Sequence, residues 1–143
     1  MIGIDTNILA RFYVDDPNDP EAAKQRPIAH SILTGSEQLF VPLTVILELE
    51  WVLRAFYRFD VSDFQRVIEH LLGLTHVNVE EWPRVMQALA LQAEGLDFAD
   101  ALHHTACNQC QIFYSFDDRR FARRAARLPL TPPVIVPNHL LSK

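Results

Sequence analysis

The chain has 143 residues, of which 49% are hydrophobic and 22% charged, and its formal net charge is −5. This length fits one domain, and this composition supplies an ordinary hydrophobic core, which excludes a disordered chain. No apolar run reaches the roughly 18–20 residues that cross a bilayer, so we expect no membrane segment. The N-terminus has no basic leader, and Cys107 and Cys110 are too few for a disulfide framework. We therefore predict a single domain over residues 1–143 in the cytoplasm.

The charge is unevenly distributed along the chain. Residues 1–110 contain 16 acidic and 7 basic side chains, a net charge of −9, whereas residues 111–143 contain 2 and 6, a net charge of +4. An acidic protein does not attract nucleic acid by its overall field. A basic segment beside a group of carboxylates, however, can hold phosphate groups while the carboxylates hold metal ions.

The first elements predicted along the chain are a short strand and two helices. A buried strand at residues 2–4 leads into Asp5-Thr6-Asn7, which is typical of a helix start, and residues 8–13 are predicted to be helical. Residues 15–20 are rich in Asp and Pro and predict a loop that separates this helix from the next. An amphipathic helix is then predicted over residues 21–33.

The next elements are a second strand and two longer helices. The strand is predicted at residues 39–41, and Thr44 is a candidate cap for a helix that extends to about Tyr57. Residues 62–65, Ser-Asp-Phe-Gln, have the spacing of a capping box and predict a helix that begins there and extends to about Leu72.

The second half of the chain alternates between strands and helices in the same way. A strand at residues 77–79 precedes a helix over residues 82–92, near whose end Gly95 is suited to the turn. Asp97 opens another helix. The last predicted elements are a strand at residues 112–115, a helix at 118–128 and a strand at 134–136. This alternation favours an α/β fold with a mostly parallel sheet flanked by helices.

Acidic side chains recur where the predicted strands end or the following helices begin. Asp5 follows the first strand, and Glu48 lies one turn inside the helix after the second. Asp97 and Asp100 lie in the first turn of one helix, and Asp117 follows the fourth strand. The carboxyl ends of parallel strands meet at one edge of a sheet, so we expect these acids to converge. Carboxylates packed together repel one another, and their oxygens favour Mg²⁺ or Mn²⁺, so convergence predicts a site for such an ion. Any one of these acids taken alone is better explained as a helix cap than as a metal ligand.

Four segments, in this order, are similar to the successive motifs of the PIN-domain ribonucleases. They are residues 2–9 (IGIDTNIL), 45–54 (VILELEWVLR), 97–102 (DFADAL) and 114–117 (YSFD). Within that family the chain most resembles the VapC type, the toxin half of bacterial toxin–antitoxin pairs. Each motif alone is weak, but the four together cover nearly the whole chain. The resemblance implies a three-layer α/β fold with a mostly parallel central sheet.

The resemblance also implies a role for particular residues. It implies catalytic roles for Asp5, Glu48, Asp100 and Asp117, of which Asp5, Asp100 and Asp117 bind Mg²⁺ or Mn²⁺. It implies supporting roles near the metal for Thr6, Asn7, Asp97, Ser115 and Asp118. Asp97 either reaches the site or caps its helix, and both interpretations stay open.

Two pairs of neighbouring acids compete for one role each. We select Glu48 over Glu50, because Glu50 has Arg54 four residues later and is expected to form an ion pair on the solvent side. We select Asp117 over Asp118, because Asp118 is the better candidate to cap the helix that follows.

Five arginines fall within residues 119–127. Four of them share one side of the predicted helix and are candidates to bind RNA phosphates: Arg120, Arg123, Arg124 and Arg127. The same face also fits an acidic partner, such as an antitoxin or a second subunit, or simply a solvated helix surface.

Two other groups of residues have simpler interpretations. Cys107 and Cys110 follow His103 at helical spacing, and we expect both thiols to pack in the core rather than to bind zinc or act in redox chemistry. Candidates to stack on bases are Trp51, Phe56, Tyr57 and Phe59, although aromatics at this spacing more often fill a core or a dimer interface.

Taken together, these features predict a metal-dependent endoribonuclease that acts as the toxin of a toxin–antitoxin system. Family precedent implies hydrolysis of RNA phosphodiester bonds that leaves a 3′ hydroxyl and a 5′ phosphate. The implied partners are an RNA substrate, a VapB-type antitoxin and a second copy of the chain. The alternatives are a catalytically silent binding domain of the same fold, and a metal-dependent DNA nuclease or phosphatase.

Overall fold

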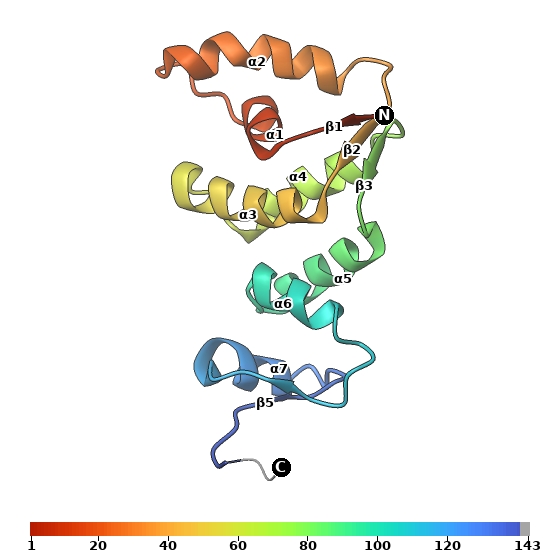
Figure 1. Ribbon diagram of the computed structural model, residues 1–143. Coiled ribbons are helices and arrows are strands. Elements are labelled where there is room, and N and C mark those ends of the chain that lie inside the picture. Colours follow the sequence, from red (N-terminus) through yellow and green to blue (C-terminus); the bar gives the residue numbers. More distant parts are fainter. Residues whose placement is uncertain (141–143) are drawn as a thin grey trace. The chain divides into compact units, whose positions relative to one another are not determined.

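A computed structural model describes residues 1–140 of the chain (Figure 1). The residues group into two compact units, residues 1–82 and the residues from 83 onward, and each is described by itself. No helix among the described residues is long and apolar enough to cross a membrane.

The first unit contains a three-stranded parallel sheet. Its strands are β1 (Ile2–Gly3), β2 (Leu39–Val41) and β3 (Val77–Val79), and β2 lies between the other two. The Ile4 N–H continues the pairing beyond β1 by donating to the Phe40 carbonyl at 2.9 Å. All three strands therefore run the same way, and the residues after them emerge at one edge of the sheet.

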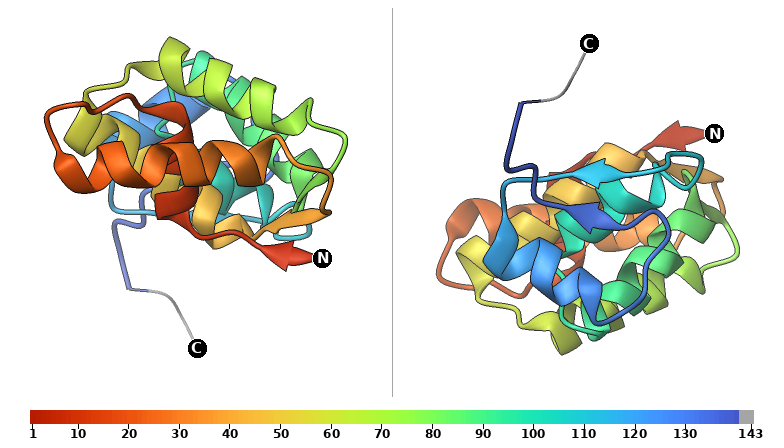
Figure 2. Two further views of the ribbon diagram at one scale, coloured as in Figure 1. Left: turned by 90° about the horizontal axis from the view of Figure 1, so that it is seen from above. Right: turned by 90° about the horizontal axis from the view of Figure 1, so that it is seen from below.

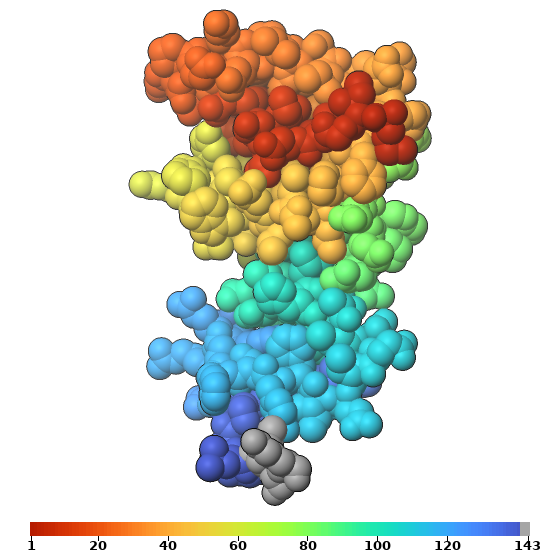
Figure 3. Space-filling view, in the orientation of Figure 1, coloured from red at the N-terminus to blue at the C-terminus, as the bar shows by residue number. Residues whose placement is uncertain are grey.

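Four helices complete the first unit. They are α1 (Thr6–Tyr13), α2 (Pro20–Leu33), α3 (Leu43–Tyr57) and α4 (Val61–Leu72). Helix α1 contacts both α2 and α3, and α4 contacts α3 and β3. The segment from β1 into α1, red in Figure 3, lies on the surface of this unit between α2 in orange and α3 in yellow. Fully buried Leu and Ile side chains fill the core, among them Leu9, Leu39, Ile46, Leu49 and Ile68.

The elements of the first unit match the predictions closely, but two predicted helix caps are wrong. Helix α3 begins after Pro42 rather than at a Thr44 cap, and the Leu43 N–H donates to the side chain of Glu80 at 2.8 Å. Pro42 has an extended backbone, and the helix begins directly after it. Glu80, which is distant in sequence, accepts the hydrogen bond of the first helical N–H, that of Leu43.

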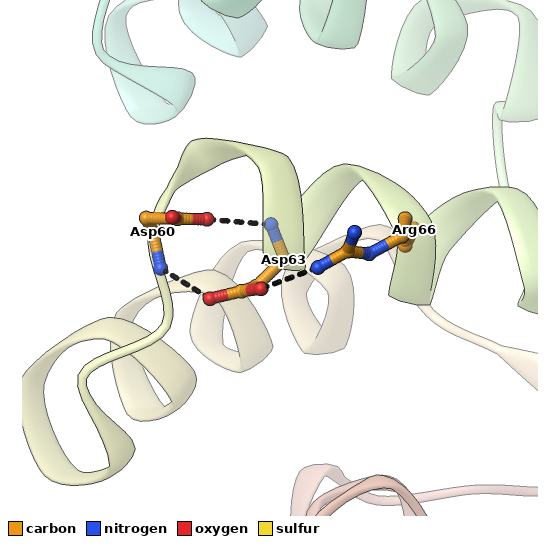
Figure 4. A network of polar contacts seen from close by, with 3 residues as sticks. All are labelled: Asp60, Asp63 and Arg66. Carbon is orange, nitrogen blue, oxygen red and sulfur yellow. Dashed lines mark hydrogen bonds and ion pairs between the residues drawn. The ribbon is translucent and has the colours of Figure 1, made fainter.

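The capping box of α4 lies two residues before its predicted place (Figure 4). The Asp63 N–H donates to Asp60 at 2.7 Å, and the Asp60 N–H donates back to Asp63 at 3.0 Å. Asp60 takes the cap position because Asp is as good a cap as Ser and its partner Asp63 is also held by Arg66 at 2.7 Å. The predicted helix is thus present, but Ser62 is inside it.

The second unit contains helices and a two-stranded parallel sheet. Helix α5 (Trp82–Ala93) begins at the boundary between the units, and α6 (Phe98–Thr105) follows Gly95, whose φ is 110°. Strands β4 (Phe113–Tyr114) and β5 (Val134–Ile135) pair in parallel and lie side by side in the right-hand view of Figure 2. Every strand pair of the described residues is therefore parallel, and the predicted α/β class is confirmed.

The arginine-rich segment is not the regular helix that the sequence predicts. A π-helical turn, η1 (Asp118–Ala122), is followed by a short helix, α7 (Arg123–Ala126). In this turn the Ala122 N–H donates to the Asp117 carbonyl, five residues back, at 3.0 Å. The wider turn buries Phe121, which packs edge-on against Phe113 at 5.4 Å. The arginines consequently do not share the single α-helical face that was expected.

Helix α6 ends at Thr105, before the two cysteines that the sequence places at helical spacing after His103. The Thr105 hydroxyl donates to the Leu102 carbonyl at 2.6 Å, and the Ala106 N–H bonds to the His103 carbonyl instead of continuing the helix. Cys107 and Cys110 therefore lie in the turns that follow, where Cys107 is half-buried and Cys110 exposed. The prediction that both thiols pack in the core is wrong.

Candidate active site

Asp5 and Glu48 are brought together through one threonine. Asp5 follows β1 and caps α1, and its carboxylate accepts a hydrogen bond from the Thr6 N–H at 2.8 Å. The Thr6 hydroxyl donates to the carboxylate of Glu48, which lies in the second turn of α3. Thr6 is only 5% exposed, whereas both acids are exposed. A buried residue thus fixes two solvent-facing carboxylates, as the convergence at one sheet edge predicted for this pair.

These two carboxylates border a cavity of about 300 Å³ in the first unit. Its lining combines acidic, polar, aromatic and basic side chains: Asp5, Thr6, Asn7, Ala10, Arg11, Glu48, Val52 and Tyr57. Asn7, predicted as a supporting residue, is therefore part of the same cavity wall. Arg11 was not predicted from the sequence, and Tyr57 was predicted only as one of several aromatics that could stack on bases. Arg11 lies one helical turn after Asn7 on α1, and that spacing is the signal that points to it.

Glu50 faces a different environment from Glu48. Its side chain is 9% exposed, and Arg54 binds it through Nε at 2.9 Å. The predicted ion pair between Glu50 and Arg54 is thus confirmed, but the expectation that Glu50 lies on the solvent side is wrong. Glu50 is buried by the packing of α3, while Glu48 is open to solvent beside Thr6.

Three acids of the second unit also lie near one another. Burial raises the pKa of Asp100, the negative charges of Asp97 and Asp117 raise it further, and His103 acts in the opposite direction. Asp97 occupies the cap position of α6, yet its side chain accepts no capping hydrogen bond. The Asp97 carboxylate therefore does not cap α6, which was one of its two predicted roles. These charges make the surroundings of Asp100 favourable for a cation.

The cap of η1 is Asp117 and not Asp118, which the sequence predicts. The Asp117 carboxylate accepts from the Arg120 N–H at 2.9 Å and caps η1, and the Asp117 N–H donates to the Ser115 hydroxyl at 3.1 Å. Asp118 instead pairs with Arg123 at 2.9 Å. The prediction of Asp118 as the cap is wrong. The negative charge of Asp117 nevertheless raises the pKa of Asp100, together with burial and the charge of Asp97.

The candidate RNA-binding arginines have unequal surroundings. Arg123 is paired with Asp118, and Arg124 donates to the Gly95 carbonyl at 2.9 Å. Arg120 and Arg127 are exposed. Two of the four guanidinium groups therefore hold the local structure of η1 and α7 together, and the other two are open to a ligand.

The donor chemistry of these acids fits a hard divalent cation. Carboxylate oxygens, with the threonine and serine hydroxyls beside them, are the ligands that Mg²⁺ and Mn²⁺ prefer. Within residues 1–82, and likewise within residues 83–140, no three His, Cys, Asp or Glu side chains are grouped so as to hold an ion by themselves.

The family model of the PIN domain matches residues 2–127, which is most of both units. This chain belongs to the PIN domain family. The sequence of this PIN domain is also similar to a protein described as a VapC ribonuclease from Aquifex aeolicus (strain VF5). The two are 30% identical over 91 residues, which cover 64% of this chain and 66% of the relative, just under two thirds of its length.

Proposed function

We propose that this PIN domain is a metal-dependent endoribonuclease of the VapC type. The observation that carries the proposal is the pair of exposed carboxylates, Asp5 and Glu48, held by buried Thr6 at the wall of a cavity. The family membership and the VapC ribonuclease relative support hydrolysis of RNA as the activity.

The proposed metal ligands are Asp5, Asp100 and Asp117. When bound, Mg²⁺ or Mn²⁺ lowers the pKa of water and offsets charge on the scissile phosphate. The protein's own residues orient the carboxylates for this role. Thr6 holds Glu48 in place, and the amide of Thr6 at the start of α1 orients the Asp5 carboxylate. Glu48 is proposed to orient or deprotonate the attacking water. Burial and the negative charges of Asp97 and Asp117 raise the pKa of Asp100, and a bound cation would favour its ionised form.

RNA and two protein partners complete the proposal. Arg120 and Arg127 are the exposed arginines proposed to bind RNA phosphates, while Arg123 and Arg124 order the segment that carries them. A VapB-type antitoxin is proposed as the inhibitor. Trp51 and Phe56 form an edge-on pair at 5.2 Å on α3, with 50% and 65% of their surfaces exposed. They are not core residues, and this apolar pair supports the proposed homodimer.

The test is cleavage of total cellular RNA by purified protein, free of any co-purified partner, in Mg²⁺, in Mn²⁺ and in EDTA. We expect discrete fragments with either metal and intact RNA in EDTA. Asp5→Asn is expected to abolish cleavage while its circular dichroism spectrum stays unchanged. Asp15→Asn is the matched control, because Asp15 is 72% exposed with one loose ion pair at 3.8 Å. Intact RNA in every lane would overturn the proposal.

A further inference from the structure

Arg11 lies beside the candidate acids and is held from both sides. It is in the last turn of α1, where its Nε donates to the Gln25 side-chain oxygen on α2 at 2.9 Å. Its Nη1 donates to the Tyr57 hydroxyl at the end of α3 at 3.1 Å. Gln25 is itself oriented by a 2.9 Å hydrogen bond from its amide nitrogen to Glu21. Three helices therefore fix the direction of one guanidinium group.

Both groups that hold Arg11 are neutral. Among the described residues Arg11 forms no ion pair, although Asp5 and Glu48 line the same cavity. A guanidinium held by neutral acceptors keeps its whole positive charge. Of its five N–H donors, two are used here, which leaves three for a ligand. A planar, oriented fork of this kind matches the oxygens of a phosphate group.

We propose that Arg11 binds a phosphate of the RNA in the cavity that Asp5 and Glu48 border, with Gln25 and Tyr57 as its positioning residues. The cavity wall otherwise offers a phosphate two negative charges, which would repel it. Among the residues that the structure describes, Arg11 is the one positive side chain in that wall. Arg11 therefore supplies the attraction for a substrate phosphate that the neighbouring carboxylates would otherwise repel. This role presupposes the ribonuclease function proposed above.

The first measurement is kcat/KM for RNA cleavage by Arg11→Gln and Arg11→Lys. Loss of charged hydrogen bonds to a phosphate is expected to lower kcat/KM about 10- to 100-fold in Arg11→Gln. Arg11→Lys keeps the charge but not the fork, so its loss is expected to be intermediate. Lys24→Gln is the control, because it removes the same charge from an exposed position on α2. Arg11→Gln with the activity of Lys24→Gln would overturn the proposal.

The second measurement separates phosphate binding from structural support by Arg11. Binding of a short labelled single-stranded RNA is measured in EDTA at several salt concentrations. Each phosphate contact contributes about 0.7 to the slope of log affinity against log salt for a single strand, so Arg11→Gln is expected to lower this slope by that amount. A merely structural role would leave the slope unchanged, and the melting temperatures of all variants are recorded alongside. An unchanged slope would overturn the proposal, whether or not the melting temperature falls.

The third measurement does not depend on ribonuclease activity. Inorganic phosphate is titrated into the ¹⁵N-labelled protein, and the Nε–Hε resonance of Arg11 is identified by its absence from Arg11→Gln. We expect this resonance to shift, and the shift to be lost at high salt. If the wild type cleaves no RNA but the resonance shifts, the ribonuclease proposal fails while Arg11 remains a phosphate ligand. A resonance that does not respond to phosphate would overturn the Arg11 proposal itself.

Discussion

Glu48 and Glu50 lie two residues apart on α3, and exchanging each for glutamine separates activity from stability. Glu48 is exposed beside Thr6, so Glu48→Gln leaves the fold intact but removes a charge from the candidate site. We expect its cleavage rate to fall at least about 100-fold, the range of a general acid or base. Its melting temperature is expected to stay within about 2 °C of the wild type.

Glu50→Gln is expected to behave in the opposite way. Glu50 is 9% exposed and its partner Arg54 59% exposed, so the ion pair is only half shielded from water. A charged hydrogen bond contributes about 1.5–3 kcal/mol, and solvent screening at Arg54 reduces this to about 1–2 kcal/mol. For a chain of 143 residues this corresponds to a fall in melting temperature of about 3–7 °C. Cleavage by Glu50→Gln at a temperature well below its melting point is expected to equal that of the wild type.

The assay pairs metal-dependent cleavage of RNA with thermal unfolding followed by circular dichroism. The two variants are compared at equal concentration in the same buffer, so that each serves as the control for the other. The assignment of Glu48 to the site is refuted if Glu50→Gln loses activity and Glu48→Gln keeps it. It is equally refuted if both variants are fully active.

Three further predictions concern the other acids. Burial and neighbouring negative charge raise the pKa of Asp100, so this carboxylate binds a proton more readily in the folded protein than in the unfolded one. The metal-free protein is therefore expected to lose stability as the pH rises through that raised pKa. Asp100→Asn is therefore expected to raise the melting temperature in EDTA at neutral pH and to reduce the stabilisation that Mg²⁺ gives, both measured by calorimetry. Asp117→Asn is expected to lower RNA cleavage at least about 100-fold, whereas Asp118→Asn lowers it less than about threefold, because Asp118 only holds Arg123; equal losses would contradict the assignment. Asp60→Ala removes the cap of α4 and is expected to lower the free energy of unfolding, measured in urea, by about 1 kcal/mol, with cleavage unchanged. A loss of activity at a temperature where this variant is still folded would instead place α4 in the site.

The strands and the first pair of acids were predictable because they depend on local sequence and on one general rule. Short apolar runs mark β1, β2 and β3, and parallel pairing then places the residues that follow them at one edge. Asp5 and Glu48 meet at Thr6 for that reason. The family motifs point to the same two acids, which is why sequence and structure agree here.

The errors occur where contacts distant in sequence decide the local structure. Leu43 starts α3 because Glu80, 37 residues later, accepts its N–H, and no local pattern contains that information. The π-helical turn at Asp118–Ala122 accompanies the burial of Phe121 against Phe113, so helical spacing misplaced the arginines. Arg11 was missed because its importance comes from Gln25 and Tyr57, on two other helices.

The central claim, hydrolysis of RNA by carboxylates that hold a divalent metal, is tested most directly by the chemistry of the fragment ends. RNA cleaved by the wild type in Mn²⁺ is examined for its 5′ termini by ligation, which requires a 5′ phosphate. We predict fragments with a 5′ phosphate and a 3′ hydroxyl, produced only with metal and absent with Asp5→Asn. Fragments with a 5′ hydroxyl and a cyclic 2′,3′-phosphate that persist in EDTA would contradict the claim, because they require attack by the ribose 2′ hydroxyl instead of water.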